Sequence, residues 1–415
     1  MRVLHVHDHE FRWPLPKGSG AKPPSGGLDA YLEALLPLQV AHGCTPAVLR
    51  FTTSPAVNVT QPGTYYELRR SGLRHRPEVT AGLQRVLDDV RPDVVHLHAV
   101  HYALSPRMLT WLLGRTAVVY TIHDVAPICL RQTKLHRDGA CCTKAVGLGC
   151  ITSGCHRLSE QAGWLRGALD ALHNRHQLAC YRRLPALIVP SRYLGEQMEI
   201  NGCDDGHVHV VPHFTRYADA PAPQRAAHDR PHLLFVGRLT AEKGTHVLAQ
   251  MLVDLRAQEW ELNIVGTGPL ESVLRARLDG VGFTKRVHFL GPLAKTELGE
   301  AYARCDAVVM PSLQPESFGL VGVEAFSFGK PVVGFVSGGM SEWLVPEQTG
   351  LTAPHGDTSA LGVQLARLLA DAELRRRLGA AGRTLVDERF GPQRHVRTLR
   401  ELYDQQATAA LRRAS

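Results

Sequence analysis

The sequence has no apolar run approaching about 18 residues, the length typical of a membrane-spanning helix. Its first residues, Met1–Asp8, read directly as a strand, without the charged region and apolar run of a signal peptide. We therefore expect a cytoplasmic protein. Lys and Arg do not gather in a long run with aromatic residues, which disfavours a nucleic-acid partner.

One short motif is also missing. No Gly-x-Gly-x-x-Gly follows the first expected strand. The segment Gly266-Thr267-Gly268-Pro269 has the first two glycines, but Pro269 and the absence of a third glycine break the fingerprint. A dinucleotide-dependent oxidoreductase is therefore disfavoured.

The length and composition of the chain indicate an ordinary two-domain enzyme. The chain has 415 residues, more than one hydrophobic core usually serves, with 21% charged and 44% hydrophobic residues. The formal net charge is +8, from 47 basic and 39 acidic residues. This excess fits an anionic ligand or an acidic membrane surface, and it equally fits a solvated surface with no partner.

Apolar strands alternate with helical patterns along the chain, which predicts parallel, doubly wound sheets. The expected domains are residues 1–212, a linker at 213–230, a second domain at 231–391, and a C-terminal helix at 392–415. The expected strands are Val3–Val6, Ala47–Phe51, Val94–Leu97, Val118–Ile122, Ala186–Val189, Val208–Val211, Leu233–Val236, Leu262–Val265, Val287–Leu290, Ala307–Met310 and Val332–Phe335.

The segment Pro315–Ala325 is the most informative. Its two glutamates, Glu316 and Glu324, have seven residues between them and surround an expected helix start. The free N–H groups and the positive end of a helix favour an anion, commonly a phosphate. One carboxylate before the helix and one in its first turns can bracket a phosphorylated ligand and accept its hydroxyl protons.

A second segment, residues 235–244, leaves an apolar strand for a helix and carries Arg238 and Lys243. Two fixed cations on such a connection can stabilise a departing diphosphate without a metal ion. Arg can hold two oxygen atoms at once, whereas Lys acts as a point charge. A helix start with solvated basic residues is the alternative.

Together these segments resemble the signature of the family 4 retaining glycosyltransferases, which have the GT-B fold. The resemblance covers nearly the whole chain and is looser before residue 120. It implies an α/β protein of two doubly wound Rossmann-like domains facing a central cleft. The implied activity moves a sugar, typically a hexose from a UDP- or GDP-sugar, to an acceptor hydroxyl of a polysaccharide, glycolipid or natural product. In this family the last helix returns to the N-terminal domain.

The resemblance also implies roles for residues. Glu316 would hold hydroxyls of the donor sugar, Arg238 and Lys243 would stabilise the diphosphate, and His123 would contact the sugar. Glu324 would hold the ribose. The remaining residues implied in donor binding are Gly26, Gly27, Gly237, Ser317, Phe318, Gly319, Leu320, Val321, His288, Phe289 and Leu290, and the loop from Ser337 is implied in sugar and phosphate contacts. No Asp-x-Asp motif is present, so we expect no catalytic metal and no required cofactor.

A cysteine-rich segment follows the motif that contains His123. Cys129, Cys141, Cys142, Cys150 and Cys155 lie within 27 residues, near His136 and His156. Thiols and imidazoles can hold a structural zinc ion, but the spacing is not that of paired Cys-x-x-Cys motifs, and reduced thiols in a loop are the alternative.

Three further questions stay open at this point. Residues 157–184 predict a long helix that could contact a membrane, shape the acceptor site, or serve as an ordinary surface helix. His96 and His98 share one face of their strand and could serve packing alone. A GT-B sugar-nucleotide epimerase and a non-catalytic sugar-nucleotide-binding protein remain alternative functions.

Overall fold

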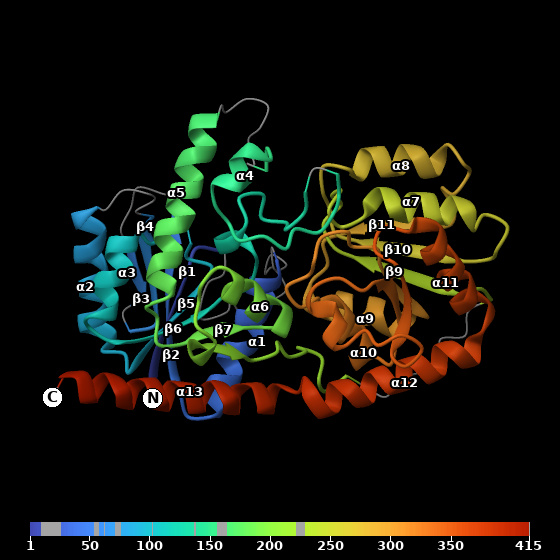
Figure 1. Cartoon of the computed structure of the whole chain (residues 1–415). Helices are drawn as coiled ribbons and strands as arrows, with labels where there is room; N and C mark the ends of the chain where they lie inside the picture. The colour runs from blue at the N-terminus through green and yellow to red at the C-terminus, as the bar shows by residue number, and fades with distance from the viewer. Residues whose placement is uncertain are drawn as a thin grey trace. The chain divides into compact units, whose positions relative to one another are not determined.

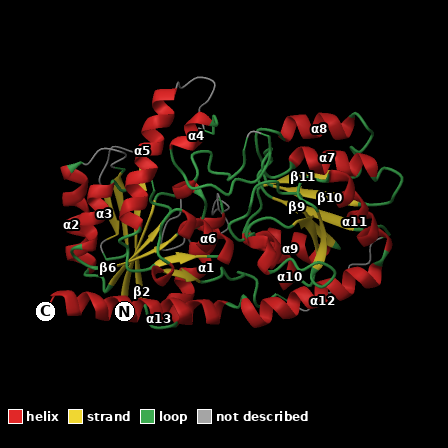
Figure 2. Cartoon of the chain, viewed as in Figure 1, coloured by secondary structure: helices red, strands yellow, loops and turns green. Residues whose placement is uncertain are grey.

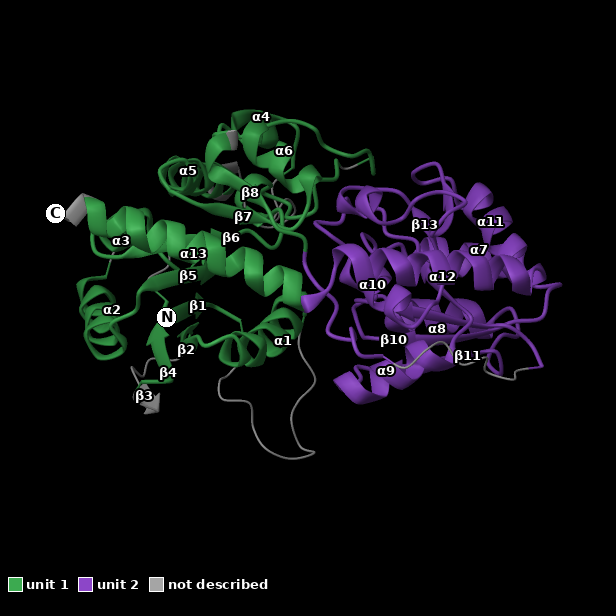
Figure 3. Cartoon of the chain, turned by 90° about the horizontal axis from the view of Figure 1, so that it is seen from below, with its two compact units in different colours: residues 1–20, 24–212, 393–415 green, residues 21–23, 213–392 purple. Residues whose placement is uncertain are grey.

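The computed structural model describes residues 1–9, 26–53, 58–61, 63–70, 76–101, 103–136, 138–155, 164–220 and 229–414. These residues form two compact units (Figure 3). The first unit comprises the described residues up to Pro212 together with those from Gln393 onward, and the second comprises His213–Pro392.

The first unit contains one sheet with the strand order β3-β4-β2-β1-β5-β6-β7-β8. All neighbouring strands are parallel except β3 and β4, which are antiparallel. The strands are β1 (Arg2–His7), β2 (Thr45–Thr52), β3 (Asn58–Gln61), β4 (Tyr65–Arg69), β5 (Val94–His98), β6 (Ala117–Thr121), β7 (Leu187–Val189) and β8 (Val208–Val210).

Helices flank this sheet (Figures 1 and 2). They are α1 (Gly27–Ala41), α2 (Pro77–Val90), α3 (Pro106–Leu113), α4 (Leu148–Thr152), α5 (Trp164–Tyr181), α6 (Arg192–Ile200) and α13 (Pro392–Ala414), with short 3₁₀ turns at Ala126–Ile128 and Asp205–His207. Pro392 stands at the start of α13, where its missing N–H costs no intrahelical bond, and Gly391 separates this helix from the preceding one.

The second unit contains a parallel sheet with the order β11-β10-β9-β12-β13-β14. Its strands are β9 (His232–Val236), β10 (Glu261–Val265), β11 (Val287–Gly291), β12 (Ala307–Met310), β13 (Val332–Phe335) and β14 (Gly350–Ala353). Its helices are α7 (Thr245–Asp254), α8 (Glu271–Asp279), α9 (Lys295–Arg304), α10 (Leu320–Ser327), α11 (Thr358–Ala370) and α12 (Ala372–Arg389), with a 3₁₀ turn at Gly339–Glu342.

Both faces of the second sheet are covered. Helices α7, α8 and α11 pack on one face around a core that includes Leu248 and Leu365. Helices α9, α10 and α12 pack on the other face around Tyr302 and Phe326 (Figure 1). Parallel strands buried on both faces need apolar side chains in every position, which explains the continuous run Ala307–Met310.

Each sheet has one point at which the strand order turns back. In the first unit it lies between β1 and β5, and in the second it lies between β9 and β12. Ligands of doubly wound sheets bind outside the carboxyl ends of the strands at such a point. A ligand site is therefore expected at the loops that follow β1, β5, β9 and β12.

The predicted fold class is confirmed, and every predicted strand is present to within about two residues. The prediction missed β3, β4 and β14, which are short and contain few consecutive apolar residues. Residues 213–220, expected as part of a linker, pack into the second unit, where the Thr215 N–H donates to the carbonyl oxygen of Phe390 (3.2 Å). In the described part of the chain, no helix is long and apolar enough to span a bilayer.

Candidate functional site

Backbone hydrogen bonds join three loops at the carboxyl ends of β9, β12 and β13. The N–H of Leu313 donates to the carbonyl oxygen of Glu242 (3.0 Å), which ties the loop after β12 to the loop after β9. Glu316 and Gly338 form a parallel bridge, and the N–H of Gly339 donates to the carbonyl oxygen of Glu316 (2.7 Å). The three loops therefore form one corner at the turning point of the second sheet.

Two glycines permit this close approach. Gly244 has φ 72°, and a Cβ placed there would lie 1.9 Å from the carbonyl oxygen of Pro311. Gly338 has φ 63°, and a Cβ there would lie 2.4 Å from the carbonyl oxygen of Glu316. A side chain at either position would clash with backbone and strain its own φ, so the corner requires glycine at both.

Lys243 and Glu316 form a largely buried ion pair at this corner. Lys243 Nζ and Ser312 Oγ both donate to Oε1 of Glu316, each at 2.6 Å. The Glu316 and Lys243 side chains are only 12% and 21% exposed. Burial alone would raise the pKa of Glu316, but Lys243, Ser312 and the charge of Arg238 outweigh it and lower this pKa. Glu316 is therefore held as an anion in a fixed position.

Arg238 adds an exposed cation to the same corner. It follows Gly237 at the end of β9, its side chain is 66% exposed, and it forms an ion pair with Glu242 (3.6 Å). Arg238 and Lys243 thus lie on one loop, one facing solvent and one held against Glu316. This arrangement offers positive charge to an anionic ligand outside the sheet.

The start of α10 is fixed by Trp343. The indole Nε1 of Trp343 donates to the carbonyl oxygen of Phe318 (2.6 Å). Gly319 precedes the helix with φ 87°, and a Cβ at Gly322 would lie 2.0 Å from the Trp343 ring. Trp343 therefore packs directly under the first turn. The Gly322 N–H donates to the carbonyl oxygen of Gly319 (3.1 Å). The first N–H groups of a helix have no acceptor one turn earlier, so a helix start of this kind can bind an anion. The sequence-predicted residues Ser317, Leu320 and Val321 lie at this half-buried helix start.

Glu324 lies one turn further along α10 and is 5% exposed. Its Oε1 accepts from Arg216 Nε (2.9 Å), and its Oε2 accepts from the Tyr302 hydroxyl (3.0 Å). The structure thus gives each carboxylate oxygen of Glu324 a partner from within the second unit. Sequence reasoning missed both partners, because Arg216 fell in the expected linker and Tyr302 reads as an ordinary core residue.

The segment His288–Leu290 lies within β11, at the edge of the second sheet and separated from β9 by β10. Phe289 is covered by the guanidinium of Arg275, whose Cζ lies 3.9 Å from the ring centroid. The structure does not bring these side chains to the Lys243–Glu316 pair. The carboxyl end of β11 is Gly291, with φ 68°.

The first unit has a cavity of about 190 Å³ at the carboxyl ends of β1, β5 and β6. His123, predicted from the sequence, contributes to its wall. The lining residues are Asp8, His9, Ala99, His101, Tyr120, Ile122, His123, Asp124, Ala126, Pro127 and Gln132. Three histidines and two aspartates are among these eleven residues, so the cavity suits a ligand with hydrogen-bonding groups.

The charged groups of this cavity influence one another. Burial raises the pKa of Asp8, although Arg70 offsets part of the effect, and burial also raises the pKa of Asp124. Burial would lower the pKa of His9, but its hydrogen bond to Asp29 and the negative charges of Asp29, Asp8 and Asp124 together outweigh that effect and raise this pKa. Sequence reasoning missed Asp8 and His9, which directly follow the first strand and could have been found from that position.

Helix α5 holds the loops that form the cavity. Asn174 Nδ2 donates to the carbonyl oxygens of Ala126 (3.1 Å) and Pro127 (3.2 Å). Gln177 Nε2 donates to the carbonyl oxygen of His101 (3.0 Å). The same helix packs into the core of the first unit through Leu178 and Tyr181, so it is a packed domain helix that also holds loops of the cavity; a role at an acceptor site stays a prediction.

Gly26 and Gly27 stand at the start of α1, and both are exposed. Gly26 is fully extended, and a Cβ there would meet no atom of the described residues within 4 Å. Packing among the described residues therefore does not require glycine at this position. The long connection that precedes it in the sequence, with Ser25, lies outside the described residues, as does His156.

The cysteines of the predicted zinc site are all thiols in the structure. Burial raises the pKa of the Cys150 thiol, and the neighbouring thiols Cys129 and Cys142 raise it further. Among the described residues, however, His5, His96 and His98 are the group whose ligand-type atoms all lie within 4.8 Å of one another. The described cysteine sulfur atoms do not form such a group, and zinc binding stays a prediction.

Family models match both halves of the chain. The model described as Glycosyltransferase Family 4 matches residues 25–216, and the model described as Glycosyl transferases group 1 matches residues 218–385. Together they cover both units.

Two curated relatives and two solved structures illustrate the similarity. A D-inositol 3-phosphate glycosyltransferase of Xylanimonas cellulosilytica is 30% identical over 296 residues, covering 60% of this chain and 70% of the relative. A glycogen synthase of Mycobacterium tuberculosis is 28% identical over 304 residues, 72% of this chain, and the match spans only 65% of the synthase.

The structural similarity extends over whole chains. A sucrose-phosphate synthase from Thermosynechococcus elongatus has a TM-score of 0.72 at 21% identity, covering 99% of this chain and 100% of that one. Anabaena HepE in complex with UDP and glucose has a TM-score of 0.68 at 17% identity, covering 98% and 100%. At these identities the likeness establishes the fold alone.

Proposed function

Because the chain belongs to family 4 of the glycosyltransferases, with the GT-B fold, we propose that it transfers a sugar from a nucleotide-sugar donor to an acceptor hydroxyl with retention of the anomeric configuration. The observation that carries this proposal is the corner formed by Arg238, Lys243 and Glu316 beside the start of α10. Positive charge and free N–H groups there match a diphosphate, and a fixed carboxylate matches sugar hydroxyls.

In the proposed reaction, the bond between the anomeric carbon and the diphosphate oxygen breaks while the acceptor oxygen bonds to the same face of that carbon. The acceptor proton passes to the departing diphosphate. Arg238, Lys243 and the first N–H groups of α10 stabilise the negative charge that develops on the diphosphate. Glu316 accepts hydrogen bonds from the sugar and orients it. No step requires a metal ion or another cofactor.

Glu324 serves the ribose in this proposal. Arg216 and Tyr302 each donate one hydrogen bond to the Glu324 carboxylate. A carboxylate can accept about four hydrogen bonds. Glu324 can therefore accept a ribose hydroxyl while its partners hold it in place. The neighbour that contains UDP supports UDP as the first nucleotide to test, with GDP second.

The acceptor binds, in this proposal, at the cavity of the first unit. Its carboxylates Asp8 and Asp124 and the imidazole groups of His9 and His101 can bind an acceptor through hydroxyl groups. A polysaccharide, a lipid-linked glycan and a small natural product all present such groups.

A product assay tests the proposed function. We expect UDP- or GDP-sugar and a hydroxyl acceptor together to give a glycoside with the donor's anomeric configuration, read by the proton–proton coupling of the anomeric signal in NMR. A new sugar nucleotide formed without acceptor would instead identify an epimerase. Donor binding without any product across a broad acceptor panel would identify a binding protein.

A further inference from the structure

The cysteine-rich segment of the first unit brings four thiols toward one region. Burial raises the pKa of Cys150 and Cys155, Cys129 and Cys142 raise both further, and Cys150 also raises that of Cys155. Because the effect of one charge on another falls off with distance, these sulfur atoms must lie near one another. The four-thiol cluster is defined as Cys129, Cys142, Cys150 and Cys155.

Backbone hydrogen bonds hold the cluster in two pairs. The N–H of Lys134 donates to Sγ of Cys129 (3.3 Å), and the carbonyl oxygen of Lys134 accepts from the N–H of Cys142 (2.7 Å). The N–H of Cys155 donates to the carbonyl oxygen of Cys150 (2.7 Å). An N–H group directed at sulfur favours the thiolate, which is the form that binds a metal ion.

The Lys134 side chain places a positive charge beside the cluster. It is 1% exposed, and its Nζ donates to the carbonyl oxygen of Lys144 (2.8 Å). Among the residues that the structure describes, no carboxylate pairs with it. The charge of Lys134 offsets part of the raised pKa of Cys150, and the charge of Arg131 does the same at Cys155.

A buried cation is costly without an opposite charge nearby. Four neutral thiols supply no such charge. Four thiolates around Zn²⁺ carry two negative charges in excess, which the two cations Arg131 and Lys134 would balance. The charges around the cluster therefore match a metal–thiolate site better than a set of free thiols.

The hydroxyl of Tyr193, on α6, also lies near the cluster. It is buried and has no hydrogen-bond partner in the described part of the chain. Burial raises the pKa of Tyr193, and the thiols Cys141, Cys129 and Cys142 raise it further. A buried hydroxyl without a partner calls for an explanation, and a metal-bound thiolate would accept its hydrogen bond. His136 is a further neighbour, with Nδ1 3.8 Å from Sγ of Cys155.

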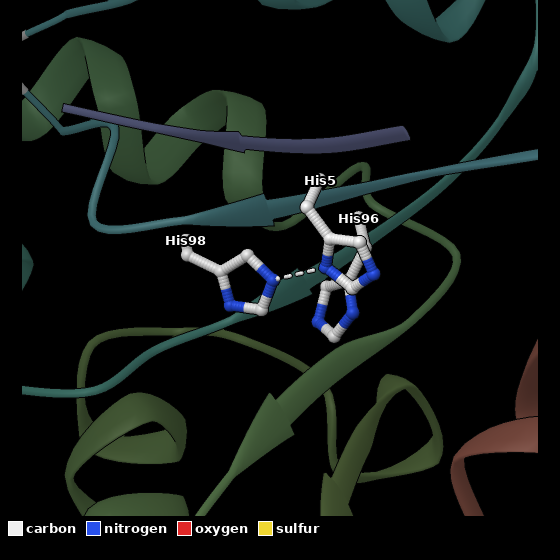
Figure 4. A group of neighbouring side chains, drawn as sticks. All are labelled: His5, His96 and His98. Carbon is white, nitrogen blue, oxygen red and sulfur yellow. Dashed lines mark hydrogen bonds between the residues drawn. The ribbon is translucent and has the colours of Figure 1, made fainter. Parts of the chain in front are cut away.

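The group of three histidines in the same unit suits a metal ion less well. His5 on β1 and His96 and His98 on β5 point toward one another and are fully buried (Figure 4). All six ring nitrogens already have hydrogen-bond partners, which are one another and Gln39, Tyr403, Thr121 and His123. A metal ion would have to break several of these bonds, and the group has no anionic ligand to balance its charge.

We propose that the four-thiol cluster binds a structural zinc ion through four thiolates, that the Tyr193 hydroxyl donates a hydrogen bond to one of them, and that Cys141 lies outside the site. Zn–S bonds of about 2.3 Å bring tetrahedral sulfur ligands within about 4 Å of one another. No three of the described cysteine sulfur atoms all lie within 4.8 Å of one another. Zinc therefore draws the four together, and the thiol protons pass to solvent.

The ion would fix one wall of the cavity in the first unit. Ala126 and Pro127 line that cavity just before Cys129, and Gln132 lines it just after. If the cavity binds the acceptor, which rests on the proposed function, removal of zinc should raise the KM for the acceptor about tenfold. Nucleotide binding by the second unit should be unchanged.

Metal analysis of the full-length protein, purified under reducing conditions, tests the proposal. We expect one zinc ion per chain, and Co²⁺ in its place should give the strong sulfur-to-metal charge-transfer absorption of thiolate ligands. Cys142→Ser and Cys150→Ser should weaken zinc binding by more than about 100-fold, the upper range for loss of an outer-shell partner. Tyr193→Phe should weaken it by about tenfold. Competition with a chelator measures these affinities.

Cys141→Ser is the matched control. Cys141 is the neighbour of Cys142 in the chain and is exposed, and its replacement should leave zinc affinity unchanged. If a ligand variant does not fold, alkylation of the wild-type protein gives the answer. Zinc should protect the partly exposed Cys142 and Cys150, while Cys141 should react equally with and without zinc, as read by mass spectrometry.

A folded protein that neither contains zinc nor takes it up would overturn the proposal, as would a disulfide within the cluster in protein alkylated directly on cell lysis. Equal loss of zinc in Cys141→Ser or His136→Asn would overturn the ligand set, and iron with inorganic sulfide would overturn the choice of metal. Zinc kept by Cys142→Ser but lost from His96→Asn would place the ion at the histidines. Absence of turnover with every donor and acceptor would overturn the proposed function alone, since the zinc measurements do not depend on it.

Discussion

The Arg238→Ala variant should lower kcat by about a hundredfold or more, with little change in stability. In the proposed reaction Arg238 supplies positive charge where the diphosphate departs, and loss of one such preorganised contact costs about 100-fold to 1,000-fold in rate. Its side chain is 66% exposed and forms a surface ion pair with Glu242, so the folded protein loses little without it. Steady-state kinetics and urea unfolding measure the two effects.

Arg304→Ala is the matched control for this prediction. Arg304 is also an exposed arginine, at 74%, and it forms an ion pair with a glutamate four residues away, Glu300 (3.5 Å). It lies at the end of α9 rather than at the corner, so its removal should leave kcat unchanged. An Arg238→Ala variant that matches Arg304→Ala in rate would contradict the role given to Arg238.

The Lys243→Met variant should be destabilised by about 3 kcal/mol, the size expected when one partner of a buried ion pair is removed. The reason is that Glu316, 12% exposed, would keep its charge in a largely buried place with Ser312 as its remaining short contact. Urea unfolding of the variant and the wild type measures the difference. Turnover should fall as well, because in the proposed reaction the same side chain stabilises the departing diphosphate.

The double variant Lys243→Met/Glu316→Gln separates charge from packing. Because the double variant leaves neither partner of the pair charged, it should recover most of the lost stability. The coupling free energy between Lys243 and Glu316 in unfolding should therefore be large at neutral pH. The pKa of Glu316 is lowered in the folded protein from its ordinary 4.5. The coupling is therefore fully present above pH 4.5 and is lost as the pH falls through the lower folded value. Equal stability of the single and double variants would show that the pair is not effectively buried.

The elements that the sequence predicted well are those with a local signal. The strand Ala307–Met310 is a continuous apolar run, and Lys243 and Glu316 lie on the connections that follow β9 and β12. A position after a parallel strand was the local signal for both residues, because ligands of such sheets bind outside the carboxyl ends of the strands.

The parts that sequence reasoning missed depend on contacts between distant residues. Trp343 reads as an ordinary apolar residue, and its place under Gly322 follows only from the packing of the loop after β13. The hydrogen bond between His96 and Tyr403 joins positions 307 residues apart. Histidine and tyrosine have no spacing pattern that indicates such a contact, so no local signal in the sequence predicts this hydrogen bond.

Calorimetric titration of UDP, GDP and ADP into the wild-type protein and Arg238→Ala tests the central claim most directly, since it needs neither the sugar nor the acceptor to be known. We predict that one nucleoside diphosphate binds the wild-type protein and that Arg238→Ala weakens that binding, while Arg304→Ala does not. Absence of binding by all three nucleotides, or equal binding by Arg238→Ala, would contradict a diphosphate site at the corner formed by Arg238, Lys243 and Glu316.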